Sequence, residues 1–173
     1  MNWKRNICVC VYFCVLYYGG TAYAHPDSGF LPDAIAETEY GIVVELNPKD
    51  IETRNKLGIV LYRTNKLDEA VKQFNAVLKI KADDFDAHDG MGLVMMKKGR
   101  HEEAMKWFEK AIALNKGDAL VFNHLGSAYE ALGDIGKAIE SYEKGLSIKK
   151  DGDILSHVEA LRKIKNGPPA KVR

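Results

Sequence analysis

The chain has 173 residues, of which 46% are hydrophobic and 28% are charged, and its formal net charge is +1. These values are typical of a globular protein of about one domain. A charge balance this close to zero argues against recognition of nucleic acid or of an anionic membrane through overall charge.

The first 24 residues differ from the rest of the chain. A positively charged MNWKRN precedes an uncharged, mostly apolar run over residues 7–18, and the Ala-Tyr-Ala at 22–24 has the small-x-small form of a signal-peptidase site. We therefore predict a signal peptide over residues 1–24, cleaved after Ala24, and a periplasmic or secreted mature protein. The alternative is a membrane anchor that stays uncleaved, although the Gly-Gly-Thr at 19–21 makes this segment a poor span.

All three cysteines, Cys8, Cys10 and Cys14, lie in the apolar run. A mature chain would contain no cysteine, which excludes disulfides, thiolate catalysis and cysteine metal sites after cleavage. Residues 25–30, HPDSGF, are rich in turn formers and are predicted to be a linker.

The segment 31–50 is predicted to contain one amphipathic helix, from Leu31 to Asn47. Pro32 suits a first helical turn, and Asn47-Pro48 closes the pattern. We expect its apolar stripe to be buried, and that stripe consists of Ile35, Tyr40, Val43 and Leu46.

From residue 51 onward one pattern recurs about every 34 residues. Glycine, alanine and aromatic positions each repeat three times in phase: Gly58, Gly92 and Gly126; Ala70, Ala104 and Ala138; Phe74, Phe108 and Tyr142. Each unit contains two short amphipathic helices joined by a turn, at Asn65-Lys66, Gly99-Arg100 and Gly133-Asp134 in the successive units. Because glycine inside a helix costs about 1 kcal/mol relative to alanine, we expect the three helical glycines to permit close helix approach against the three alanines.

This period and these in-phase residues resemble the tetratricopeptide repeat (TPR) family. The resemblance covers residues 51–84, 85–118 and 119–152 and implies an all-α fold, a right-handed α-α superhelix or TPR solenoid. The family's usual tryptophan near the start of the first helix is replaced by Arg54, His88 and Phe122. In this register, segment 31–50 is a half-repeat helix whose open side is capped by Phe30 and Leu31 or contacts another molecule.

After the repeats, residues 153–166 are predicted to form a capping helix with Asp153 ahead of it, and residues 167–173 a disordered tail. The apolar positions of this helix are Ile154, Leu155, Val158, Leu161 and Ile164.

No sequence motif favours catalysis or metal binding. Ser141 and Lys144 match an S-x-x-K pattern, but Tyr142 between them belongs to the predicted core and the companion motifs are absent. Four aspartates at 83, 84, 86 and 89 lack calcium-loop spacing and are interpreted as carboxylates at a helix start. The histidines, expected to be solvated or to face a groove, are His25, His88, His101, His124 and His157. We predict no enzyme activity, no cofactor and no metal.

The resemblance implies that the first helix of each unit lines a groove for a protein or peptide partner. Helical spacing predicts the residues on that face: Asn55, Ile59, Tyr62, Arg63, Asp89, Leu93, Met96, Lys97, Asn123, Ser127 and Glu130. The apolar members of the first two units lie beside Arg63 and Lys97, which favours a partner with an apolar anchor and a nearby carboxylate. The alternative is that neighbouring side chains simply cover these apolar residues.

These features favour a non-catalytic, exported scaffold or adaptor, without nucleic acid and without stable membrane insertion after signal cleavage. The alternative function is a chaperone-like accessory of envelope complex assembly, for example in cytochrome maturation or secretion. A metal-binding or catalytic protein is a third possibility, which the sequence opposes.

Overall fold

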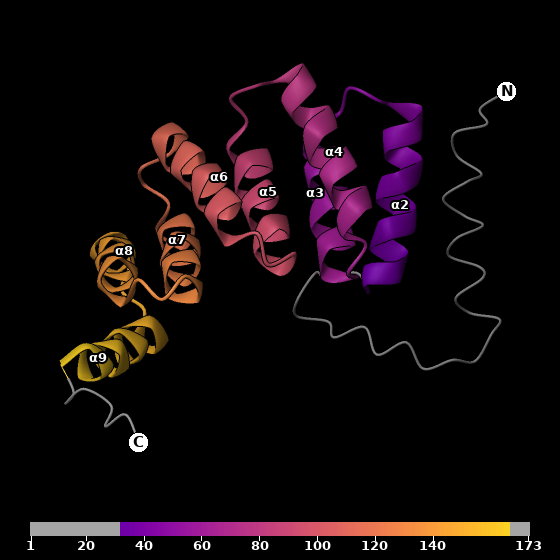
Figure 1. The fold of residues 1–173 in the computed structure, drawn as a ribbon. Coiled ribbons are helices and arrows are strands. Elements are labelled where there is room, and N and C mark those ends of the chain that lie inside the picture. The colour runs from indigo at the N-terminus through magenta and orange to yellow at the C-terminus, as the bar shows by residue number, and fades with distance from the viewer. Residues whose placement is uncertain (1–31, 167–173) are drawn as a thin grey trace, which may run out of the picture. The chain divides into compact units, whose positions relative to one another are not determined.

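The computed structural model describes residues 32–166, and these residues are helical throughout apart from short connections (Figure 1). The described helices are α2 (Asp33–Leu46), α3 (Ile51–Arg63), α4 (Leu67–Ile80), α5 (Phe85–Lys97), α6 (His101–Leu114), α7 (Ala119–Ala131), α8 (Ile135–Ile148) and α9 (Gly152–Asn166). The expectations for the signal peptide, its cysteines, His25, the linker, capping by Phe30 and Leu31, and the tail lie outside these residues.

The helices pack in sequential pairs. The most extensive contacts join α3 with α4, α5 with α6, and α7 with α8, and each second helix also contacts the first helix of the next pair. Figure 1 shows these helical hairpins following one another along the chain. The prediction of an all-α repeat fold is therefore confirmed.

Each first helix begins at an aspartate that caps it. The side chain of Asp50 accepts a hydrogen bond from the backbone N–H of Thr53, and Asp84 and Asp118 accept from the corresponding N–H groups of α5 and α7. These carboxylates satisfy N–H groups that the helix itself leaves unpaired. The backbone and hydroxyl donors of Thr53 lower the pKa of Asp50, because they stabilise its charged form.

The turns inside the pairs lie where the sequence predicted them, and they take the left-handed backbone conformation. Their φ angles are 65° at Asn65, 73° at Gly99 and 79° at Gly133. After each of these residues the next N–H donates back to a carbonyl in the last turn of the first helix, for example from Arg100 to Met95 at 2.9 Å. This pattern is a Schellman-type helix end, which favours glycine or asparagine.

The core is built on the aromatic series, with Phe74 and Phe108 completely buried and Tyr142 almost so. A Cβ atom on Gly92 would lie 2.3 Å from Cε1 of Phe108, and one on Gly58 would lie 2.6 Å from Cε1 of Phe74. The atoms nearest to these two glycine positions belong to the aromatic rings. The glycines leave space for the aromatic rings, which fill the core beside the first helix.

The buried stripe of α2 differs from the expected one. Ala36 and Val44 are buried and Tyr40 packs against the core, whereas Ile35 and Val43 are exposed and Leu46 is 79% exposed. The reason is that α2 packs chiefly against α3. Helix α3 covers only the side of α2 that carries Ala36, Tyr40 and Val44, which are spaced four residues apart.

Helix α9 also departs from its predicted stripe. Val158 and Leu161 are buried and Ile154 is partly buried, but Leu155 and Ile164 are exposed because α8 covers only one side of this helix. The N–H groups of Asp153 and Ile154 donate to Asp151 Oδ1, so Asp151, rather than Asp153, lies ahead of the helix. In the described part of the chain no helix combines the length and apolarity needed to cross a membrane.

Candidate protein-binding face of the first helices

The residues predicted to contact a partner come from three helices that are neighbours in space. Helix α3 contacts α5, and α5 contacts α7, although equivalent positions of these helices are a full repeat apart in the sequence. We call the surface formed by the predicted partner-binding residues of α3, α5 and α7 the first-helix face.

The apolar part of the first-helix face comes from the first two repeats. Ile59 and Tyr62 of α3, and Leu93 and Met96 of α5, are all partly buried and pack against the main core cluster. Each side chain therefore helps to cover the core and also leaves apolar surface open to solvent. The four apolar residues that helical spacing had assigned to one patch thus lie on two helices that contact each other, α3 and α5.

The two basic residues beside this patch interact with groups of the chain itself. Arg63 forms an ion pair with Asp33 of α2. Lys97 Nζ donates to the Tyr62 carbonyl at 2.9 Å and lies 4.7 Å from the centroid of the Tyr62 ring. A partner carboxylate must therefore compete with these contacts, which helical spacing alone could not predict.

Asn55 does not present its side chain at the surface. It is only 7% exposed, and its Nδ2 donates to Asp84 Oδ1 at 2.8 Å. Since Asp84 is the cap of α5, this bond joins the first repeat to the start of the second. Asn55 thus has a structural position within the first-helix face, which helical spacing could not reveal because its partner belongs to the boundary of the next repeat.

The middle of the face contains an aspartate and histidine pair. Asp89 Oδ1 lies 2.8 Å from His124 Nδ1, and their side chains are 17% and 19% exposed. His88 is buried, with Nδ1 2.8 Å from the carbonyl oxygen of Asp84. The expectation of a solvated or groove-facing histidine was therefore wrong for His88, because its ring packs against Trp107 of α6.

In the third repeat the predicted residues are tied to later helices. Asn123 lies against Gly145 of α8, where a Cβ atom would be 2.5 Å from Asn123 Oδ1. Ser127 Oγ lies 3.0 Å from the Tyr142 hydroxyl, which donates to Glu130 Oε2 at 3.1 Å. The open apolar part of the first-helix face is thus confined to α3 and α5.

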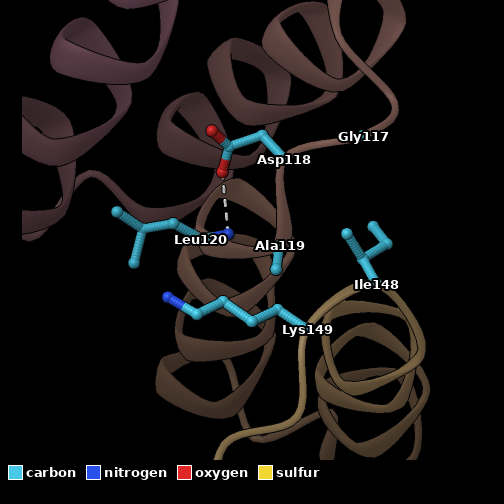
Figure 2. Close-up of a pocket in the computed structure, with 6 residues that line it drawn as sticks. All are labelled: Gly117, Asp118, Ala119, Leu120, Ile148 and Lys149. Carbon is cyan, nitrogen blue, oxygen red and sulfur yellow. Dashed lines mark hydrogen bonds between the residues drawn. The ribbon is translucent and has the colours of Figure 1, made fainter.

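One hollow of about 480 Å³ lies between the start of α7 and the end of α8, where Leu120 and Ile148 are exposed (Figure 2). Its single carboxylate belongs to Asp118, which accepts a hydrogen bond from Leu120 N at 2.8 Å and so caps α7. This carboxylate is therefore part of the start of α7.

The residues considered for other chemistry have structural contacts. Ser141 Oγ donates to the carbonyl of Lys137 at 2.9 Å, as serine often does inside a helix. Among residues 32–166, no group of three histidine, cysteine, aspartate or glutamate side chains could hold a metal ion.

Two family models match the sequence. The one described as "Tetratricopeptide repeat" matches residues 84–151, and the one described as "TPR repeat" matches residues 60–99. Together the two matches cover more than half of the chain, and they include all or part of each repeat. No curated protein matches the chain at the level of sequence.

Solved structures of repeat proteins have the same fold. A crystal structure of MamA is 25% identical with a TM-score of 0.68, covering 77% of this chain and 78% of that one. MamA from residue 41 to its end, from Desulfovibrio magneticus RS-1, is 22% identical with a TM-score of 0.69, covering 95% and 87%. A thermophilic TPR protein of Thermus thermophilus is 19% identical with a TM-score of 0.66, covering 75% and 74%. Sequence period, helix pairing and these matches agree that the chain belongs to the tetratricopeptide repeat family.

Proposed function

We propose that the chain is a non-catalytic, exported scaffold or adaptor that binds a protein or peptide on its first-helix face. The observation that carries this proposal is the patch of Ile59, Tyr62, Leu93 and Met96, which two neighbouring repeats leave partly exposed. Apolar side chains gathered on adjacent helices are a common anchor site for peptides and helices. TPR folds typically bind proteins and lack catalytic activity, which supports the same function.

The partner presents an apolar anchor and, beside it, a carboxylate that reaches Arg63. The Arg63 and Asp33 side chains are 30% and 35% exposed, and ion pairs of this kind contribute only about 0–1 kcal/mol. A partner carboxylate can therefore replace Asp33 at small cost. The apolar contact contributes most of the affinity, since burial yields about 25 cal/mol per Å² of apolar surface.

The double variant Leu93→Asp and Met96→Asp tests this site. Two new charges in the patch should lower partner affinity at least tenfold, because they would have to lose their hydration in the complex. The partner, identified by cross-linking in the native cell, would be purified and titrated calorimetrically.

A matched control carries the same chemical change elsewhere. Ile80 and Leu114, at the ends of α4 and α6, are 45% and 43% exposed, and their double aspartate variant should bind like the parent. The Leu93 and Met96 double variant would rule out the first-helix face as the site if it bound the partner with the affinity of the parent. Circular dichroism would check that the variant is folded.

Export belongs to the same proposal and is supported by the sequence of residues 1–24. The expected mature protein begins at His25. Intact-mass measurement on the protein purified from its own cells should give a mass that begins at His25, and a mass that includes Met1 would contradict signal cleavage.

A further inference from the structure

A second candidate site lies between α6, α7 and α8. This cavity of about 280 Å³ is lined on α7 by Phe122, Leu125 and Tyr129, and Ser141 and Lys144 of α8 form one wall. We call it the third-repeat slot. It shares no residue with the first-helix face, because it lies on the side of α7 that faces the second helices.

The equivalent position in the second repeat is filled by the chain itself. His88 and Trp107 stand one repeat before Phe122 and Ser141, and their ring centroids lie 5.5 Å apart. Lys110, which corresponds to Lys144, has its Nζ 4.8 Å from the centroid of the Trp107 ring. The indole is thus in contact with an aromatic ring and an ammonium group.

The first repeat also closes this position with a long side chain. Gln73, at the position of Trp107, accepts a hydrogen bond at 2.8 Å from Arg54, at the position of His88. The third repeat has only Ser141 there, and its hydroxyl donates to the Lys137 carbonyl. No long side chain therefore reaches toward Phe122 from this position of α8, and Lys144 has no ring there of the kind over which Lys110 lies.

We propose that the third-repeat slot binds a tryptophan side chain of a partner polypeptide, in the place that Trp107 occupies in the second repeat. The cavity is slightly smaller than the roughly 300–1,000 Å³ of small-molecule sites, which suits a single large side chain. The indole ring packs against Phe122 and lies beneath the Lys144 ammonium, so that an aromatic pair and a cation–π contact add to apolar burial. The carboxylates of Glu109 and Glu140 at the rim can accept from the indole N–H.

The direct test uses N-acetyl-tryptophanamide as the probe and N-acetyl-leucinamide as its matched control. Each would be titrated into the purified, ¹⁵N-labelled chain. The tryptophan probe should cause saturable NMR shift changes centred on residues 122–129 and 141–144, with a Kd on the order of 1 mM for so small a ligand. Equal affinity for the leucine probe, no binding, or shifts centred elsewhere would overturn the proposal.

Variants separate the slot from other surfaces. Ser141→Trp should fill the slot as Trp107 does, abolish probe binding and leave the melting temperature at or above that of the parent. Lys144→Gln should weaken the probe about two- to fivefold through loss of the cation–π contact, whereas Lys150→Gln should not.

Each result with these variants supports or refutes binding of the probe in the third-repeat slot. If Ser141→Trp does not fold, the comparison of Lys144→Gln with Lys150→Gln decides it, and equal affinities would refute the slot. The Leu93 and Met96 aspartate variant should bind the probe like the parent. Failure of the first-helix face and failure of the slot are therefore observed separately.

Discussion

At the scale of single residues, Tyr142 shows how one position acquires a role that its counterparts lack. Phe74 and Phe108 occupy the same place in the earlier repeats, but the Tyr142 hydroxyl donates to Glu130, and the carboxylate of Glu130 also lies 2.8 Å from His157 Nε2. The Tyr142 and His157 rings meet edge to face, with centroids 5.4 Å apart. This polar group therefore connects α7, α8 and α9 where the repeats end.

Burial raises the pKa of Tyr142 to about 12, and the charge of Glu130 acts in the same direction. Since the unfolded tyrosine titrates near pH 10, the unfolded state loses its proton first, and stability falls as pH rises from about 10 to 12. At pH 11 this loss amounts to about 1.4 kcal/mol. Urea denaturation at pH 8 and pH 11 should show that the free energy of unfolding falls less in Tyr142→Phe than in the parent. The same loss in parent and variant would show that Tyr142 is not its source.

At the scale of single helices, α2 and α9 show that an apolar pattern in the sequence does not always predict which residues are buried. The repeat period located the helix pairs and their turns, because each internal helix has neighbours on both sides that the period itself implies. For α2 and α9 the covered side depends on one neighbour only, and the sequence does not say which apolar residues that neighbour reaches. The expected burial of Leu46 and Ile164 failed for this reason.

Two glycines inside helices, Gly92 and Gly41, offer a paired prediction because their surroundings differ. Gly92→Ala should destabilise the fold by about 1–3 kcal/mol, because the added methyl group would lie 2.3 Å from the Phe108 ring in a packed core. Gly41→Ala in α2 is the control, since no atom lies within 4 Å of its added Cβ, and it should stabilise by up to about 1 kcal/mol. Thermal melts would measure both, and equal effects would contradict the tight fit at Gly92.

At the scale of the whole molecule, the candidate sites were only partly predictable. Helical spacing found the four apolar residues of the first-helix face, because they depend on one helix period. It could not predict the ion pair between Arg63 and Asp33, because the period of a single helix does not say where α2 lies relative to α3. A comparison of Gln73, Trp107 and Ser141 in an alignment of the three repeats could have indicated the third-repeat slot, because the small residue stands where its counterparts are long.

The capping aspartates Asp50, Asp84 and Asp118 have a consequence for how such a chain can change length. Each first helix has a capping aspartate directly before it, at the end of the preceding segment, and a left-handed turn directly after it. Removing residues 85–118 would place Asp84 directly before α7, where it can take over the capping role of Asp118. Duplication or loss of one 34-residue unit would therefore leave every first helix with a capping aspartate before it.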